Sequence, residues 1–414
     1  MGLFKHRRLG WRTLRFKTAG SDVVKLQEFL RQQGYDLGEE KDYGYLTKDA
    51  VRQFQRDHGL VADGIAGPRF FALILQKDLP VRRNVHIVQG GETAAEIAAC
   101  YGVGLSALTN LTEGGRVYPG QRLVFFDREV WGIFKSAKAN LPVDSLTGLI
   151  LSPAADELVD TNLAAVRMAS LGQDDGILRI HEILGGRKQR KQAVKDALGE
   201  ARGLAGFYLP WRQVAAPDGR RYLSFLKALR RALDQKMLLT ELGPGVSPWR
   251  LWGGVDYSRV NDLADRVVLS LPIDDAPGSI VERKKAAELL ASLLPQIHSW
   301  KILLRVPVFA VEWEEAAGKV SWLKLPYSTG LSRAFRYGAR LEEDEKGGLF
   351  YRYRRRDSRF YLYLPQYNAL AGIFALANLY NLAGVILDEL GMEDPRIWAA
   401  LKDHFRAAKL KFGE

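Results

Sequence analysis

Short apolar runs alternate with helical stretches along the C-terminal part of the chain. From about residue 146 onward, runs of strand length are separated by segments such as 221–235 and 280–297, whose apolar residues recur at helical spacing. Parallel strands need such crossovers, so this order predicts repeated βα units. Eight runs qualify as strands: 147–153, 177–184, 204–211, 237–244, 266–273, 301–313, 359–365 and 383–390. Eight strands close a (β/α)8 barrel, which we therefore expect over residues 146–414.

One interval between the predicted strands is too long for a connecting loop. Residues 314–357 lie between the sixth and seventh runs and carry their own apolar and aromatic residues. Connections in compact domains are short, so an inserted α+β subdomain is expected there.

The residues before the barrel divide into two smaller units. A single hydrophobic core stops growing near about 250 to 300 residues, so a chain of 414 residues should hold several domains. Residues 18–77 show helical periodicity interrupted by glycine turns and predict a small all-α bundle. Residues 84–127 show the order strand, helix, helix, strand, with Thr93 and Glu96 spaced as a capping box. Residues 128–145 are expected to be a linker.

The first unit resembles the peptidoglycan-binding domain found on wall hydrolases. The matching positions are Asp22-Val23, Leu26-Gln27, Leu30, Gly34-Tyr35, Tyr43-Gly44, Thr47, Ala50-Val51, Phe54-Gln55, Gly59-Leu60, Asp63-Gly64 and Gly67-Pro68. It departs from the pattern at Glu40-Lys41 and Phe70, where Asp-Gly and Thr are usual. The resemblance implies a wall glycan as the ligand.

The second unit resembles a LysM domain, which binds polymers containing N-acetylglucosamine. The matching residues are Val88-Gln89, Gly91-Glu92-Thr93, Ile97-Ala98, Tyr101-Gly102-Val103, Leu108, Pro119-Gly120-Gln121 and Leu123. In this family the glycan lies between the first strand-to-helix loop and the loop before the last strand. The resemblance therefore implies glycan-binding residues at Gly90, Gly91, Glu92, Thr93, Asn110 and Pro119.

The barrel resembles family 18 glycoside hydrolases, in particular the spore-type enzymes that carry LysM modules. The landmarks are Ile183-Leu184-Gly185-Gly186, Val306-Pro307-Val308-Phe309, Glu312-Trp313, Tyr337-Gly338-Ala339, Asp344-Glu345, Phe350 to Tyr353, Asn381 to Gly384, Leu390-Gly391, Asp394-Pro395 and Trp398. They extend over nearly the whole predicted barrel.

The acids that this family uses for catalysis are missing. The enzymes have the pattern D-G-x-x-x-D-x-E at the end of the third strand, where the Glu donates a proton and an Asp orients the substrate's acetamido group. Aligned on Gly206, these positions are Ala205, Pro210 and Arg212. An arginine stays charged and cannot donate a proton usefully near neutral pH. Ser270 to Ile273 and Asp388 replace further landmarks, a tyrosine motif and a tryptophan. Family 18 hydrolysis is therefore not expected.

Other polar and aromatic residues fall at the predicted C-terminal strand ends, where barrel enzymes gather their catalytic groups. The acids could form a relocated active site or pair with the nearby Arg179, Arg212, Arg266 and Arg305, and we favour pairing. His181 is expected to be a packed strand residue. A candidate cleft comprises Tyr208, Trp211, Glu182, Glu312 and Asp388. The remaining acids at the rim are Glu241, Asp274, Asp275 and Glu389. Further candidates for stacking on sugar rings are Trp249, Trp252 and Trp313.

Composition narrows the choice of partners. The chain has 60 Lys and Arg against 48 Asp and Glu, a formal net charge of +12, which favours polyanionic partners. No nucleic-acid motif accompanies this charge, and no metal-ligand spacing or cofactor motif is found, so neither nucleic acid nor a cofactor is predicted.

No apolar stretch approaches the about 20 residues of a membrane span, and no apolar region follows the basic start, so no Sec signal is expected. The single cysteine, Cys100, excludes an internal disulfide and is expected in a core.

The sequence thus predicts a protein that binds peptidoglycan or a related N-acetylglucosamine polymer, with a catalytically degenerate barrel. The family resemblance places it in the spore coat, spore cortex or cell wall, with spore-coat proteins as further partners. Two alternatives stay open. One is a wall-modifying glycosidase with a relocated active site, and the other is a structural component of spore-coat assembly.

Overall fold

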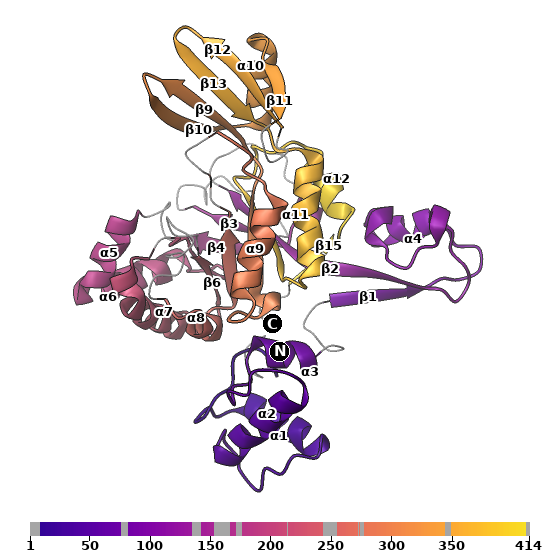
Figure 1. Ribbon diagram of the computed structural model, residues 1–414, viewed down its shortest axis with the longest axis vertical. Coiled ribbons are helices and arrows are strands. Elements are labelled where there is room, and N and C mark those ends of the chain that lie inside the picture. The colour runs from indigo at the N-terminus through magenta and orange to yellow at the C-terminus, as the bar shows by residue number, and fades with distance from the viewer. Residues whose placement is uncertain are drawn as a thin grey trace.

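The computed structural model describes most of the chain, and Figure 1 shows its parts. The described residues are 9–75, 82–134, 142–152, 166–170, 176–212, 214–242, 255–271, 273, 277–343 and 349–410. Asp274, Asp275, Trp249 and Trp252, which the sequence analysis named, lie outside these residues.

The N-terminal unit is a small helical bundle, as predicted. It contains α1 (Ser21–Gln32), α2 (Tyr45–Asp57) and α3 (Pro68–Ile74). Their apolar faces meet in one core around Leu26, Val51 and Phe71. Glu40, one of the departures from the family pattern, accepts hydrogen bonds from the backbone nitrogens of Leu46 (3.1 Å) and Thr47 (2.9 Å) in the first turn of α2. A carboxylate in this position satisfies free N–H groups and favours the helix dipole, so the departure is compatible with the fold.

The second unit has the expected strand and helix order, with 3-10 turns in place of the second helix. Its elements are β1 (Arg82–Ile87), α4 (Ala94–Tyr101), the turns Leu105–Ala107 and Glu113–Gly115, and β2 (Arg122–Phe134). The predicted capping box of Thr93 and Glu96 is present at the start of α4. Cys100 is exposed, so the expectation of a core thiol was wrong.

Strand β2 belongs to two units at once. Its first half, Arg122 to Asp127, pairs antiparallel with β1. Its second half pairs in parallel with β14 (Gly384–Asp388) and β3 (Gly148–Leu151). The prediction of a linker at 128–145 was therefore wrong for residues 128–134. Three charged residues, Asp127 to Glu129, separate the two apolar runs of β2 and suggest the end of a strand, but the structure continues the strand through them.

The C-terminal part is a closed barrel of eight parallel strands, as predicted. The strand order is β2-β3-β4-β5-β6-β7-β8-β14, and β14 closes onto β2. The strands not yet given are β4 (Val166–Ser170), β5 (Gly206–Leu209), β6 (Met237–Leu242), β7 (Arg266–Ser270) and β8 (Ile302–Pro307). β15 (Arg406–Ala407) adds to the outer half of β2.

Two of the predicted barrel strands were wrong. Residues 177–184 lie in helix α5 (Ile177–Gly185), and residues 359–365 lie mostly in β13 of the insertion. Strands β4 and β2 take their places. In α5 the buried residues Ile180, Ile183 and Leu184 recur at helical spacing, which a short apolar run does not distinguish from a strand. The landmark Ile183 to Gly186 therefore ends a helix instead of a strand.

Two apolar cores flank the barrel wall. The inner core comprises side chains such as Trp131, Ile150, Val268 and Ile386, which fill the barrel. The outer core lies between the strands and the surrounding helices, and it is the larger of the two. These helices are α6 (Arg187–Glu200), α7 (Gly219–Leu233), α8 (Tyr257–Leu263), α9 (Arg283–Leu293), α11 (Tyr367–Leu379) and α12 (Ile397–Lys402).

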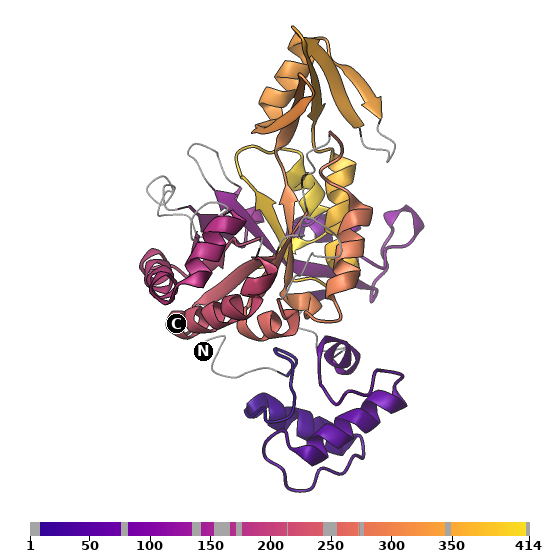
Figure 2. The same cartoon turned by 60° about the vertical axis from the view of Figure 1, so that its left-hand side comes forward.

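The insertion after β8 is an antiparallel sheet with one helix. Its strands are β9 (Ala310–Ala316), β10 (Lys319–Leu325), β11 (Arg340–Glu343), β12 (Leu349–Arg355) and β13 (Ser358–Tyr363), in the order β10-β9-β13-β12-β11. Helix α10 (Tyr327–Arg336) packs on one face. The inserted sheet extends beyond the predicted 314–357 on both sides. It stands at the opposite end of the barrel from the N-terminal bundle (Figure 2).

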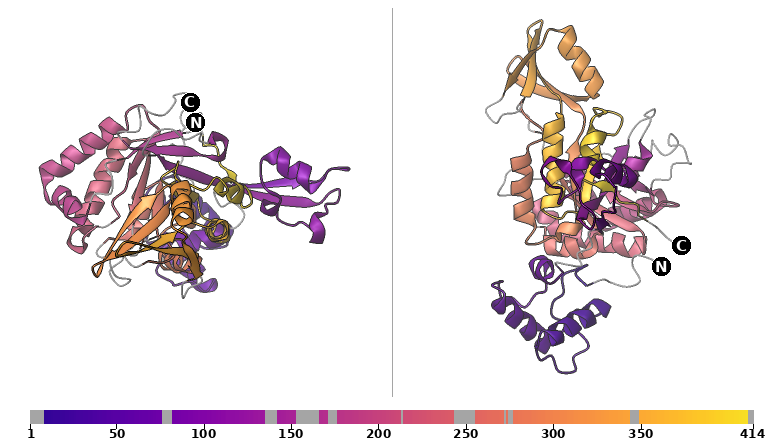
Figure 3. Two further views of the ribbon diagram at one scale, coloured as in Figure 1. Left: turned by 90° about the horizontal axis from the view of Figure 1, so that it is seen from above. Right: turned by 90° about the vertical axis from the view of Figure 1, so that its right-hand side faces the viewer.

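The N-terminal bundle is attached to the floor of the barrel, the end where the strands begin. The backbone nitrogen of Thr13 donates to Asp262 (3.0 Å), and Arg15 forms an ion pair with the same carboxylate (2.6 Å). Phe71 stacks on His298, and Trp300 enters the core of the bundle. The two views of Figure 3 show the bundle below the barrel and the β1–α4 unit projecting from its side. Among the helices of the described residues, none is long and apolar enough to cross a membrane.

Closure of the barrel generates a test at Gly384. A Cβ atom at this position would lie 1.9 Å from the backbone oxygen of Glu129, where β14 meets β2. We expect Gly384→Ala to lower the free energy of unfolding by about 3 kcal/mol, because backbone atoms must move. Urea unfolding followed by circular dichroism measures this. Gly199→Ala in α6, where a Cβ meets open space, is the matched control and should change stability by less than about 1 kcal/mol. Equal effects of the two changes would contradict the analysis.

Candidate functional site

The positions of the missing family acids lie along β5 and just after it. Ala205 precedes the strand and makes only backbone bonds, to Arg167 (2.9 Å) and Met237 (3.1 Å). Within the strand, Tyr208 points into the barrel and is buried. Arg212 follows at the mouth, where its Nε lies 2.7 Å from Glu241. Arg212, which the sequence alignment sets against the family's proton donor, is therefore a cation paired to a carboxylate.

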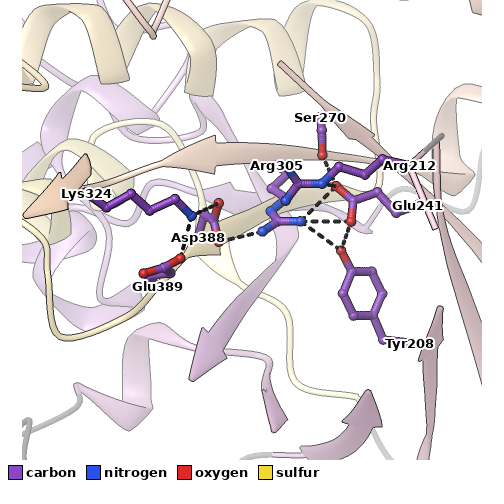
Figure 4. Close-up of polar contacts among 8 residues, drawn as sticks. All are labelled: Tyr208, Arg212, Glu241, Ser270, Arg305, Lys324, Asp388 and Glu389. Carbon is purple, nitrogen blue, oxygen red and sulfur yellow. Dashed lines mark hydrogen bonds and ion pairs between the residues drawn. The ribbon is translucent and has the colours of Figure 1, made fainter. Parts of the chain in front are cut away.

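Glu241 is at the centre of a set of polar contacts at the barrel mouth. It lies near the end of β6 and is fully buried. Arg305 of β8 donates from Nη1 to both carboxylate oxygens, each at 2.8 Å. The hydroxyls of Tyr208 and Ser270 donate to the same carboxylate. With Arg212, four side chains from four positions around the barrel thus converge on one buried anion (Figure 4).

The contacts continue from Arg305 to the last strand and the insertion. Nη2 of Arg305 donates to Asp388 at the end of β14 (2.7 Å). Lys324 of β10 lies 4.0 Å from Asp388 and donates to Glu389. We call these eight residues the mouth network: Tyr208, Arg212, Glu241, Ser270, Arg305, Lys324, Asp388 and Glu389. Its three cations and three carboxylates balance in charge.

Glu389 has a backbone conformation that side chains rarely adopt. Its φ is 61°, in the left-handed region. Such a conformation costs about 1 kcal/mol or more and persists where neighbouring contacts hold it. Here the contact with Lys324 joins this residue to the inserted sheet.

The electrostatics keep Glu241 and Asp388 of the network ionised. Burial by itself would raise the pKa of Glu241, but Arg305 and Arg212 lower it below its ordinary value. Burial would likewise raise the pKa of Asp388, but Arg305 and Lys324 bring it to about 2. Burial raises the pKa of the Tyr208 hydroxyl, which therefore stays protonated. A general acid must carry a proton near the working pH, and neither carboxylate does so at neutral pH.

The structure confirms the expected arginine pairing for Glu182, Glu241 and Asp388, whereas Glu312 pairs with Arg333 and Glu389 with Lys324. Glu241 and Asp388 pair with Arg305, and Glu182 pairs with Arg179 (3.2 Å). Arg266 instead pairs with Glu129, at the floor of the barrel.

Three residues of the candidate cleft do not lie there. Glu182 is on the exposed surface of α5. Trp211 is buried in the outer core and stacks on Phe225, with ring centroids 4.9 Å apart. Glu312 is buried within the insertion, where Arg333 and Tyr353 donate to it. Only Tyr208 and Asp388 of that set belong to the mouth network. The errors for Glu182 and Trp211 follow from misplaced strand ends.

His181 was also misplaced by the sequence analysis. It lies on α5 with a half-exposed side chain, and its Nδ1 is 2.6 Å from the buried carboxylate of Asp218. Lys324 was missed altogether, because an alternating polar strand such as β10 gives no sign of which lysine will reach the barrel mouth. Among the described residues, no group of three or more His, Cys, Asp or Glu side chains could hold a metal ion.

The predicted glycan-binding residues lie on two neighbouring loops of the second unit. Gly90, Gly91, Glu92 and Thr93 connect β1 to α4, and Pro119 precedes β2. The two loops meet where the nitrogen of Gly120 donates to the oxygen of Val88 (2.8 Å). Asn110, with a φ of 68°, accepts from the side chain of Gln121 at 2.6 Å. The structure thus brings the six residues to one end of the unit.

Comparisons with known proteins agree with this architecture. Residues 19–74 match the model of a family described as "Putative peptidoglycan binding domain". No curated protein sequence matches the chain.

The larger part of the chain is similar in fold to solved structures of low sequence identity. The spore cortex-lytic enzyme SleL of Bacillus megaterium is 17% identical with a TM-score of 0.56, over 80% of this chain and 89% of that one. A chitinase of Chromobacterium violaceum is 20% identical with a TM-score of 0.55, over 67% and 98%. A glycoside hydrolase family 18 N-acetylglucosaminidase of Paenibacillus barengoltzii is 15% identical with a TM-score of 0.51, over 67% and 99%. The barrel therefore has the fold of family 18 hydrolases, next to a peptidoglycan-binding domain.

The mouth network predicts a large cost for removing Arg305. Arg305→Ala leaves Glu241 and Asp388 buried without their shared cation, which should lower the free energy of unfolding by about 3 to 5 kcal/mol. Arg179→Ala removes a cation from the exposed pair with Glu182 and should cost less than about 1 kcal/mol. Denaturant titration of both variants measures the difference. Similar costs would show that the network does not stabilise the fold.

The lowered pKa of Asp388 predicts a loss of stability in acid. The pKa falls from an ordinary 3.8 to about 2 in the folded protein. The carboxylate therefore stabilises the fold fully above pH 4, and this contribution, about 2 kcal/mol, is lost as the pH falls from about 4 to about 2. Asp388→Asn lacks this titration, so its unfolding free energy should change less over the same interval. Parallel pH profiles of the two proteins would contradict the assignment.

Proposed function

We propose that this protein binds peptidoglycan in the cell wall or spore cortex and that its barrel does not hydrolyse glycans by the family 18 mechanism. The observation that carries the second part is the ion pair of Arg212, at the proton donor's position, with the buried Glu241. Arginine stays protonated at any pH at which the fold survives, so it cannot serve as the acid.

Of the acids that the structure describes at the mouth, neither Glu241 nor Asp388 replaces the missing acid. Substrate-assisted retention needs a protonated carboxyl group at the glycosidic oxygen and a second carboxylate that orients the acetamido group. Glu241 and Asp388 are buried, ionised and already hydrogen-bonded to Arg305. Breaking the hydrogen bonds between either carboxylate and Arg305 would leave an unpaired buried charge. Pro210 and Ala205 offer no carboxylate at the orienting positions. These contacts favour a binding role over the alternative of a relocated glycosidase site.

Binding is assigned first to the N-terminal bundle, on the strength of the family match over residues 19–74. We assign the second unit as a LysM domain, because its strand, capped helix and returning strand bring Gly90 to Thr93 close to Pro119. Glu92 fixes the first loop by accepting from the backbone nitrogen of Gln89 (2.6 Å) and by contacting His86 (2.8 Å). Asn110 completes the proposed glycan-binding set.

The proposed location follows from the ligand. Peptidoglycan is found in walls and in the spore cortex, and solved structures of similar fold include spore cortex-lytic enzymes. We therefore place the protein at the spore cortex, spore coat or wall, with coat proteins as additional partners. A purely structural role in coat assembly predicts tight protein partners and little affinity for glycan.

The test follows binding and hydrolysis in one experiment. Purified full-length protein is incubated with insoluble peptidoglycan from vegetative walls and from spore cortex, and the pellet and the soluble sugars are both assayed. We expect the protein to sediment with the polymer and to release no fragments, because Glu241 and Asp388, two acids described at the mouth, are ionised.

Two variants separate the alternatives. If fragments are released, and Asp388→Asn abolishes release while Glu182→Gln does not, the barrel has a relocated active site and the proposal of a degenerate barrel is wrong. Glu182 is the matched control because it is an acid on an exposed helix away from the mouth network. If the protein stays in the supernatant with both polymers, the binding proposal fails, and a role in coat assembly becomes the better explanation.

A further inference from the structure

One face of the inserted sheet is covered by α10, and the other face carries a row of aromatic and arginine side chains. The strand registers place Trp322 opposite Trp313, Trp313 opposite Tyr361, Tyr361 opposite Arg352, and Arg352 opposite Arg340. Directly opposed residues lie on the same face of a sheet. The row therefore crosses all five strands on the face away from α10. Its middle is covered, because Trp313 is 1% exposed and belongs to the outer core, whereas Arg352 of β12 and Arg340 of β11 are exposed.

The arginines of this face are opposed to one another. Besides Arg340 and Arg352, the register pairs Arg354 with Arg359. Like charges directly opposite each other destabilise a sheet. Acidic neighbours offset part of this charge, since Glu342 lies 2.7 Å from Arg352.

The four guanidiniums surround one hollow. Its volume is about 480 Å³, and Arg340, Arg352, Arg354 and Arg359 line it with Tyr337 and Tyr353. Among the described residues, those that line the hollow include no acid. Tyr337 and Tyr353 pack on the α10 side of the sheet, so residues from both sides line the hollow. The two rings stack with centroids 5.0 Å apart and form one wall.

The same face leads to the mouth of the barrel. Lys324 is opposite Val311, and Val311 is opposite Tyr363, one row closer to the barrel than Trp313. Since Lys324 contacts Glu389, this row adjoins the mouth network. In Figure 2 the sheet stands above the carboxyl ends of the barrel strands. This part of the face is buried, since Val311 is 0% and Tyr363 is 2% exposed, so the proposed site is confined to the hollow.

We propose that the arginine-lined hollow of the inserted sheet is a second binding site, for a glycan that carries repeated oxyanions. Guanidinium groups bind carboxylate or phosphate in a bidentate manner, and aromatic rings provide flat apolar surface for sugar rings. The arginine cluster indicates an anionic ligand by itself. The choice of a glycan over a nucleic acid rests on the proposed function, because the same chain carries the peptidoglycan-binding match.

The experiment measures binding of the full-length protein to soluble polymers by isothermal titration calorimetry. Polygalacturonate supplies carboxylates on a sugar chain, dextran phosphate supplies phosphates, and plain dextran supplies neither. We expect binding to one or both acidic polymers and none to dextran. The double change Arg340→Gln and Arg354→Gln should weaken this binding about tenfold or more, because charged hydrogen bonds are lost.

Matched variants separate the site from general charge. Arg340→Lys with Arg354→Lys keeps the charge but loses the bidentate geometry, and it should weaken binding less than the glutamine pair. Arg220→Gln with Arg231→Gln removes the same charge from the exposed surface of α7, and it should change affinity less than about twofold. Circular dichroism confirms that each variant is folded.

Several outcomes would overturn the inference. The first is that the protein binds neither acidic polymer. The second is that the folded variant with Arg340→Gln and Arg354→Gln binds as tightly as the unchanged protein. The third is that the α7 control loses as much affinity as that variant. Tighter binding of single-stranded oligothymidylate than of either acidic glycan would identify nucleic acid as the ligand instead. Sedimentation with peptidoglycan tests the proposed function separately. If the protein fails to sediment with peptidoglycan but binds acidic glycan through Arg340 and Arg354, the proposed function fails and the inference of this second site still holds.

Discussion

The pairing of β2 with both β14 and β3 is the constraint on which the architecture depends. A parallel barrel has no free edge only if its first and last strands meet, and here they meet along Glu129 to Gly132. The same strand continues outward as the partner of β1. The second unit is therefore held by a continuous backbone hydrogen-bond ladder. The close contact at Gly384 shows how little space the closure leaves.

The two ends of the closed barrel carry different charge arrangements. At the floor, Glu129 pairs with Arg266 and accepts a hydrogen bond from Trp131 (2.9 Å), near the attachment of the N-terminal bundle. At the mouth, where barrel enzymes place catalytic acids, Arg212 and Arg305 enclose Glu241. A buried carboxylate that is paired with two arginines in this way stabilises the fold. These contacts stabilise the mouth, and they underlie our proposal that the barrel does not hydrolyse glycans by the family 18 mechanism.

Much of the site could be predicted from the sequence, but its geometry could not. The alignment on Gly206 placed Arg212 at the donor position, and the proximity of acids and arginines to strand ends indicated ion pairing. The choice of partners depended on which strands are neighbours, so Arg266 was expected at the rim and lies at the floor with Glu129. Lys324 comes from a strand that hydrogen-bonds only within the insertion. Its approach to Glu389 depends on the tilt of that sheet over the barrel.

The sequence by itself determined the helical bundle at residues 18–77 and the parallel barrel that follows it, because these depend on local periodicity. The loss of the family acids stays a prediction. The tertiary structure alone decided that β2 serves two units, that residues 177–184 are a helix, and that four arginines of the insertion share one face. Apolar runs of eight residues fit either a helix or a strand until packing selects one. The register that aligns Arg340 with Arg352 exists only once the sheet has formed.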